Sequence, residues 1–129
     1  GDSRAYVMRG GTLKQVTEDH SLVGEMVRSG IISDEDAKVH PRRNVITRSL
    51  GTHEDLVTDT PDSPFPLIDG DLFLLCSDGL TSLVDEDELE PIMASCSPRE
   101  ACDKLVDLAN EKGGKDNVTA QVIKLPEKS

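Results

Sequence analysis

The segment DGDLFLLCSDG, residues 69–79, is the most strand-like stretch of this chain. Asp69-Gly70 predicts a turn, and the run from Leu72 to Cys76 that follows contains no polar residue. A short, unbroken apolar run is typical of a strand that lies inside a sheet with both faces buried. The run ends at Ser77-Asp78-Gly79, where Asp-Gly is a common turn pair. Asp78 is therefore either a turn residue or a side chain that the strand carries into a site.

Further strands are predicted on both sides of this segment. Residues 3–9 alternate as a strand does, RGGT at 9–12 supplies a glycine turn, and residues 13–17 complete a hairpin. Residues 116–125 predict a last strand by the same alternation. Between them, short extended pieces are expected at 44–51 and 55–61, and the prolines of 61–67 favour an irregular loop.

Four segments predict helices, and three of them have a recognisable start or stop. Ser21 is a candidate N-cap for residues 21–30, and Ser33 is one for residues 33–40, where acidic residues fill the first turn. Two longer helices are expected at 84–96 and 97–114, the latter with a serine cap, a proline at its first position and glycines at its end.

The composition limits the classes of function. With 129 residues, of which 36% are apolar, the chain can form one modest domain. Its 14 basic residues against 25 acidic ones give a net charge of −11, which argues against binding to nucleic acid or to an anionic membrane surface. The excess carboxylates are expected mainly to keep the protein soluble, although some could bind divalent cations.

The cysteines and the absence of targeting signals indicate a reducing compartment. The three cysteines leave an odd thiol and show no Cys-x-x-Cys spacing, and no signal peptide or long apolar segment occurs in the sequence. We therefore expect a cytoplasmic location. Cys76, inside the apolar run, is expected to be a core residue and not a nucleophile.

Three aspartates stand beside the ends of predicted strands: Asp2, Asp78 and Asp116. If the strands are neighbours, the three carboxylates could meet at one edge of a sheet. Their mutual repulsion would then require compensation, which bound Mg²⁺ or Mn²⁺ could provide. Taken singly, each aspartate has a simpler interpretation as a turn or cap residue.

Three motifs in order carry a resemblance to a known family. GDSR (1–4), LLCSDGL (74–80) and KDNVT (115–119) resemble the C-terminal half of the metal-dependent serine/threonine protein phosphatases of type 2C, the PPM family, and its bacterial members in particular. Residues 17–51 are similar to that family's segment from a hairpin strand through the flap to the next strand. The resemblance covers nearly the whole chain.

The resemblance implies an α+β fold. We expect the chain to form part of an α-β-β-α sandwich with mostly antiparallel sheets, of which the N-terminal half is absent. Residues 1–129 would then be the C-terminal portion of a single catalytic domain, with the flap at about 21–47.

The resemblance also implies hydrolysis of phosphoserine and phosphothreonine in proteins by a metal-activated water. Two Mn²⁺ or Mg²⁺ ions are expected, with a third held more weakly. Asp78 and Asp116 match the ligands of the catalytic ions, and Asp2 matches the acidic residue associated with the third. Asn117 and Gly79 are expected to support these ligands without binding metal themselves. No catalytic side chain is expected beyond the metal ligands.

Part of the family's active site has no equivalent in this sequence. The first half of the family carries an arginine that binds phosphate, an Asp-Gly pair that joins both metals, and the remaining strands of the sandwich. We therefore expect a complete parent to be active and these residues alone to have little or no activity. Expected partners are phosphorylated proteins and a cognate serine/threonine kinase, with the protein itself a monomer.

Two competing functions stay open from the sequence. A non-catalytic, phosphatase-like interaction module would use the same elements, but retention of Asp78 and Asp116 argues against it. An acidic Ca²⁺-binding domain would need a spaced loop of oxygen ligands with a central glycine, which this chain lacks. His40, Arg42 and Arg43 could contact a substrate from the flap, yet the more conservative interpretation is a solvated loop.

Overall fold

The computed structural model describes residues 2–43, 45–48, 68–114 and 116–125. The chain divides into two compact units. One unit comprises Gly1–Asp2 with Glu18–Phe65, and the other comprises Ser3–Thr17 with Pro66–Ser129.

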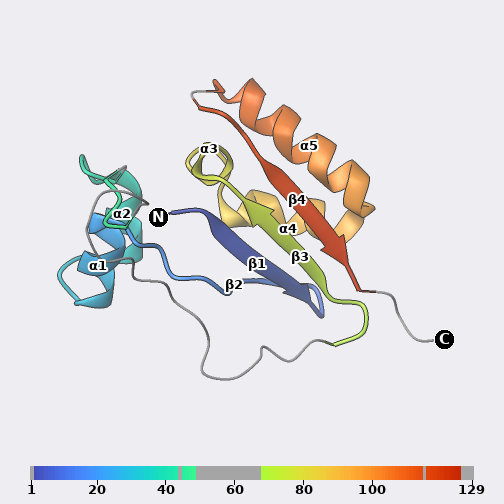
Figure 1. Ribbon diagram of the computed structural model, residues 1–129, viewed down its shortest axis with the longest axis horizontal. Helices are drawn as coiled ribbons and strands as arrows, with labels where there is room; N and C mark the ends of the chain where they lie inside the picture. Colours follow the sequence, from blue (N-terminus) through green and yellow to red (C-terminus); the bar gives the residue numbers. More distant parts are fainter. Residues whose placement is uncertain (1, 44, 49–67, 115, 126–129) are drawn as a thin grey trace. The chain divides into compact units, whose positions relative to one another are not determined.

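The second unit is built on a four-stranded sheet with the order β2-β1-β3-β4 (Figure 1). The strands are β1 (Arg4–Arg9), β2 (Thr12–Gln15), β3 (Leu72–Cys76) and β4 (Ala120–Lys124). All neighbouring strands are antiparallel. Together with the helices, this sheet confirms the predicted α+β fold, and β3 lies inside the sheet as predicted. The α-β-β-α sandwich and the single-domain assignment stay predictions.

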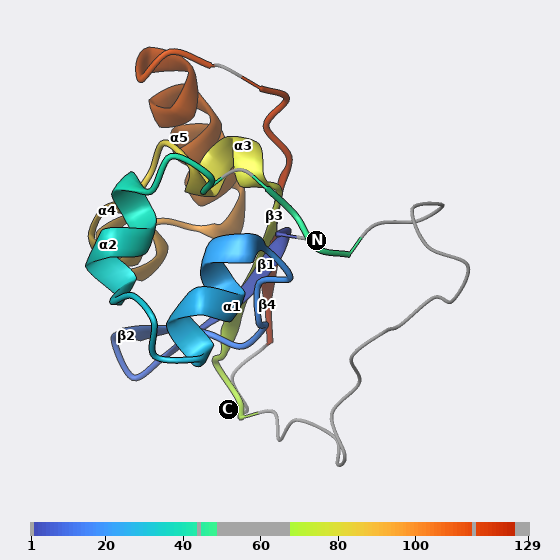
Figure 2. The ribbon, with the colours of Figure 1, turned by 90° about the vertical axis from the view of Figure 1, so that its left-hand side faces the viewer.

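Three helices of this unit lie on one face of the sheet: α3 (Asp78–Thr81), α4 (Glu86–Ser95) and α5 (Pro98–Glu111) (Figures 1 and 2). Alternate strand residues point into the core that they cover, among them Tyr6, Leu74 and the buried Cys76. The helices contribute Leu80, Leu89 and Leu105 to the same cluster. The interpretation of Cys76 as a core residue is confirmed.

The other face of the sheet is only partly covered. Leu75 and Ile123 are 41% and 42% exposed, so within the described residues only the face of β3 toward the helices is buried, not both faces as predicted. The reason is the alternation of side chains along a strand: Leu74 and Cys76 point toward the helices, and Leu75 points away from them. In the described part of this unit, all the helices lie on the face of Leu74.

Two further sequence predictions are corrected at the ends of β3 and β4. Residues 116–119 precede β4 as a loop, so the last strand starts later than predicted. Asp78 and Gly79, interpreted as a turn, begin the short helix α3 instead. The alternation of Val118 to Lys124 could not reveal where hydrogen bonding to the neighbouring strand begins.

The first unit contains α1 (Leu22–Arg28) and α2 (Asp34–Val39). The predicted caps are confirmed: the Oγ atoms of Ser21 and Ser33 accept hydrogen bonds from the backbone N–H groups of Gly24 and Asp36 at 3.0 and 3.1 Å. Ser21 also forms an isolated bridge with Ile46, inside the predicted extended piece at 44–51. The predicted piece at 55–61 and the loop at 61–67 lie outside the described residues.

No helix among the described residues has both the length and the apolar character needed to cross a lipid bilayer.

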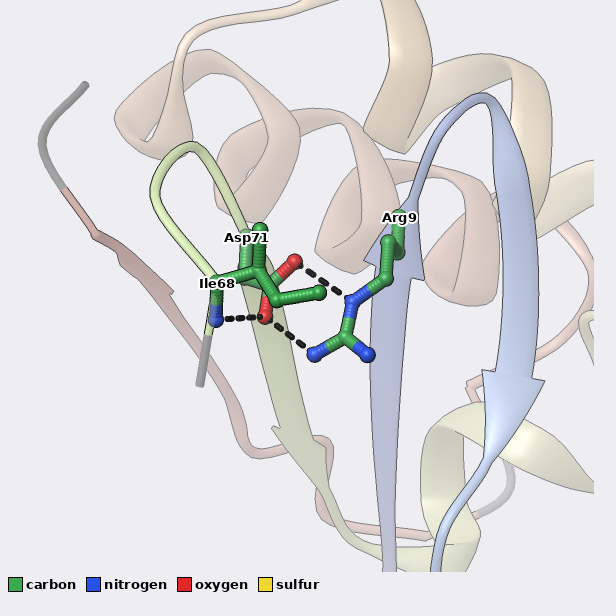
Figure 3. Close-up of polar contacts among 3 residues, drawn as sticks. All are labelled: Arg9, Ile68 and Asp71. Carbon is green, nitrogen blue, oxygen red and sulfur yellow. Dashed lines mark hydrogen bonds and ion pairs between the residues drawn. The ribbon is translucent and has the colours of Figure 1, made fainter. Parts of the chain in front are cut away.

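A bidentate ion pair joins the last residue of β1 to the residue before β3 (Figure 3). Arg9 donates from Nε to Asp71 Oδ1 at 2.9 Å and from Nη2 to Oδ2 at 2.5 Å. The backbone N–H of Ile68 donates to the same Oδ2 at 2.9 Å. Asp71 is only 2% exposed, so these donors replace the water that its carboxylate loses. The hydrogen bond from Arg9 holds the pKa of Asp71 below its usual range.

Replacing Asp71 by Asn is expected to lower the free energy of unfolding at pH 7, because a neutral amide leaves the guanidinium without its paired charge. Because the pKa of Asp71 is lower in the folded state, its carboxylate stabilises the fold fully above the unfolded pKa of about 3.9. This stabilisation is lost as the pH falls through the folded-state pKa. The difference from wild type should therefore shrink between pH 7 and pH 3 in urea denaturation. Asp69→Asn, at an exposed position, is the matched control. If Asp71→Asn lowers the unfolding free energy equally at pH 7 and pH 3, the Asp71 carboxylate is not the source of the stabilisation.

Candidate metal centre

The strand register brings the end of β3 and the start of β4 to the same end of the sheet. Cys76, the last residue of β3, pairs with Ala120, the first residue of β4, and with Arg4, the first residue of β1. Asp78 lies two residues beyond β3, and Asp116 lies four residues before β4. Both predicted ligands therefore lie on segments that adjoin the same end of the sheet.

Ser77 connects these two segments with three hydrogen bonds. Its backbone N–H donates to the carbonyl of Thr119 at 3.0 Å, which extends the β3–β4 pairing by one residue. Its Oγ accepts a hydrogen bond from the N–H of Thr119 at 3.0 Å and donates one to the carbonyl of Asn117 at 3.3 Å. The segment that carries Asp116 is therefore attached directly to the residue before Asp78.

Gly79 permits a second close contact between the same segments. A Cβ atom built on Gly79 would lie 2.1 Å from the carbonyl oxygen of Asn117, a separation that no side chain allows. Gly79 is buried in the first turn of α3. Asp78 consequently stands between two residues that both contact Asn117, the neighbour of Asp116.

The two carboxylates differ in their surroundings but are both accessible in part. Asp78 is half-buried and Asp116 is exposed. The Oδ1 atom of Asp116 accepts a hydrogen bond from the backbone N–H of Asn117 at 2.7 Å, which orients the carboxylate. In the ranges that the structure covers, neither side chain forms an ion pair. Accessible carboxylate oxygens without a cationic partner are the hard ligands that Mg²⁺ and Mn²⁺ prefer.

The donor set fits such a metal in kind but falls short in number. Within the described residues, no three metal-binding side chains come together. Asp2 precedes β1 and belongs to the other compact unit, so its assignment as a ligand stays a prediction. Octahedral coordination by Asp78 and Asp116 alone would leave most positions to water or to other ligands.

Tyr6 and the residues His40, Arg42 and Arg43 of the predicted flap have local structural contacts. Tyr6 is fully buried, and burial raises its pKa to about 12. Its hydroxyl accepts a hydrogen bond from Arg4 Nη1 at 2.9 Å, so at neutral pH it is no acid or base. His40 Nδ1 accepts from the N–H of Arg42 and its carbonyl accepts from Arg43 Nη1, both at 3.0 Å. These contacts shape a local turn.

Comparison with known proteins gives consistent matches along the chain. The family model described as protein phosphatase 2C matches residues 1–118. The serine/threonine phosphatase stp of Listeria welshimeri is 48% identical over 124 residues, which are 95% of this chain and 48% of that protein. The chain thus spans about half the length of the curated relatives that it matches.

Solved structures match the chain over a similar share of its length. The serine/threonine phosphatase PstP/Ppp of Mycobacterium tuberculosis matches with a TM-score of 0.86 and 38% identity, over 98% of this chain and 53% of that one. A catalytic domain of PstP, crystallised in complex with two manganese ions, matches with a TM-score of 0.75 and 36% identity, over 95% of this chain and 51% of that one.

Substituting Gly79 by Ala is expected to push the Asn117 segment away, because the added methyl group cannot occupy the space of its carbonyl oxygen. Overpacking of this kind costs about 1–3 kcal/mol of unfolding free energy, which chemical denaturation would measure. Ser82→Ala, at an exposed position near the end of the same short helix, should stay within about 0.5 kcal/mol of wild type. Equal stability of the two variants would argue against the close contact.

Proposed function

Because this chain belongs to the protein phosphatase 2C family, we propose that the protein containing it is a metal-dependent phosphatase of phosphoserine and phosphothreonine in proteins. The observation that carries the proposal is the attachment of the Asp116 segment to Ser77 and Gly79, on either side of Asp78. Two carboxylates on adjoining segments, with no cationic partner in the described ranges, suit a divalent cation.

We assign the metal as Mn²⁺ or Mg²⁺, with two catalytic ions and a third at Asp2. A relative crystallised with two manganese ions supports manganese and the two catalytic ions, and the third ion rests on the resemblance of Asp2 alone. Asp78 and Asp116 would bind the catalytic ions through their carboxylate oxygens, and Asn117 would orient Asp116 through its backbone N–H. The remaining ligands, the phosphate-binding arginine and the Asp-Gly pair would come from sequence outside these 129 residues.

When bound, such ions supply a water of lowered pKa as nucleophile and neutralise charge on the phosphoryl oxygens. The described residues contribute position: Ser77 and Gly79 hold the ligand segments together, and the β3 core anchors them. Tyr6 and Cys76 are buried in that core and are not needed for proton transfer.

The substrates would be phosphorylated proteins, docked beside the flap at residues 21–47, and a cognate serine/threonine kinase would produce them. We further propose a cytoplasmic, monomeric protein. A non-catalytic interaction module is the competing function, and it would not require Asp78 or Asp116 to be carboxylates.

Replacing Asp78 by Asn in the complete protein should lower Mn²⁺-dependent hydrolysis of a phosphothreonine peptide by more than about 100-fold, since loss of a partner outside the coordination sphere already costs about 10–100-fold. Circular dichroism should show that the fold is retained, because Asp78 is half-buried and packs little into the core. Asp87→Asn, an exposed acid on α4, should leave the rate unchanged. Wild-type activity in Asp78→Asn would refute the assignment.

Purified residues 1–129 alone should hydrolyse para-nitrophenyl phosphate with Mn²⁺ at no more than a trace rate, because two carboxylates cannot complete a two-metal site. The complete protein, assayed under the same conditions, provides the reference. Efficient hydrolysis by the isolated residues would show that the necessary ligands are all present within them.

A further inference from the structure

Ser77 occupies an N-cap position but does not cap its own helix. Ser21, Ser33 and Ser97 each accept a hydrogen bond from a backbone N–H of the helix that they precede. Ser77 precedes α3 with the same extended backbone, at φ −83° and ψ 167°, yet its side chain forms no such bond. Serine at this position normally accepts from the second or third residue of its helix.

The hydroxyl group is directed to the other ligand segment instead. A serine hydroxyl has one proton to donate and lone pairs to accept. Here it donates to the carbonyl of Asn117 and accepts from the N–H of Thr119, so it spans both sides of Val118. The Ser77 side chain therefore makes no capping hydrogen bond to α3 and makes two hydrogen bonds to the loop before β4.

Within the described residues, this loop is held by the packing of Val118 against the core and by its contacts with Ser77 and Gly79. Residues 116–119 precede the first ladder pair of β4, and Asn117 and Thr119 are exposed. The carbonyl of Asn117 is held by the Ser77 hydroxyl and lies against Gly79. The position of Asp116, one residue earlier, therefore depends on these contacts.

We propose that Ser77 is a positioning residue for the metal centre, because its hydroxyl holds the backbone of residues 117–119 and thereby keeps Asp116 beside Asp78. This inference rests on the proposed function. Ser77 itself binds neither metal nor substrate in this arrangement. Its removal should weaken metal binding through Asp116 and leave the core unchanged.

The test compares three variants of the complete protein that carries this sequence: Ser77→Ala, Ser77→Thr and Ser82→Ala. Isothermal titration with Mn²⁺ should show affinity weakened about 10-fold or more in Ser77→Ala, as expected for loss of a supporting hydrogen bond. Ser77→Thr keeps the hydroxyl and should restore binding to near the wild-type value. Ser82→Ala removes an exposed hydroxyl at the C-cap of the same short helix and should bind Mn²⁺ as wild type does.

Amide hydrogen exchange gives a second measurement that does not depend on metal. In the metal-free protein, the N–H of Thr119 should exchange faster in Ser77→Ala than in wild type or Ser82→Ala, because it loses its acceptor. The N–H groups of Phe73 and Ile123, which face each other as a hydrogen-bonded pair of β3 and β4, should keep their protection.

The outcomes separate this inference from the proposed function. Unchanged Mn²⁺ affinity in Ser77→Ala, with normal binding by wild type, overturns the positioning role alone. A global loss of amide protection in Ser77→Ala, without recovery in Ser77→Thr, also overturns it, because Ser77 would then serve the whole fold. No Mn²⁺ binding by the wild-type protein overturns the proposed function and this inference with it.

Discussion

The contact between Gly79 and the carbonyl oxygen of Asn117 is the constraint on which the candidate site depends. A glycine in α3 lets two backbones approach to a separation that leaves no room for a methyl group. The β3–β4 ladder delivers both segments to this point, because Cys76 pairs with Ala120. The positions of Asp78 and Asp116 therefore depend on backbone contacts and on the pairing of β3 with β4.

The carboxylates at the two ends of the sheet differ in their partners. At one end, Asp71 is nearly inaccessible to solvent and is neutralised by Arg9, which is the usual condition for a buried carboxylate. At the other end, Asp78 and Asp116 lie on adjoining segments and, within the described ranges, have no cationic side chain as partner. This asymmetry assigns a structural role to the carboxylate at the first end and supports the proposed cation site at the second.

Much of the fold was predictable because its signals are local. Hydrophobic alternation located β1, an unbroken apolar run located β3, and the serine caps located α1, α2 and α5. The helix α3 was missed because four residues are too few to show a helical period. The exposure of Leu75 was missed because an unbroken apolar run does not reveal which of its faces a helix layer covers.

The site was predictable only in part, for a related reason. The family motifs indicated Asp78, Asp116, Asp2, Asn117 and Gly79 as candidates, and their roles stay predictions. The Ser77 hydroxyl bonds residues 40 and 42 positions later, and the Arg9–Asp71 pair spans 62 positions, so no local pattern reveals these contacts. Such contacts depend on the strand register, which a single sequence does not specify. A serine directly between a strand and a candidate ligand is a local signal that could have indicated Ser77.

Anomalous diffraction at the manganese edge, from crystals of the complete protein grown with Mn²⁺, would locate the metal directly. We expect manganese within coordination distance of the carboxylates of both Asp78 and Asp116. Manganese bound elsewhere, or none at either carboxylate, would refute the proposed metal centre.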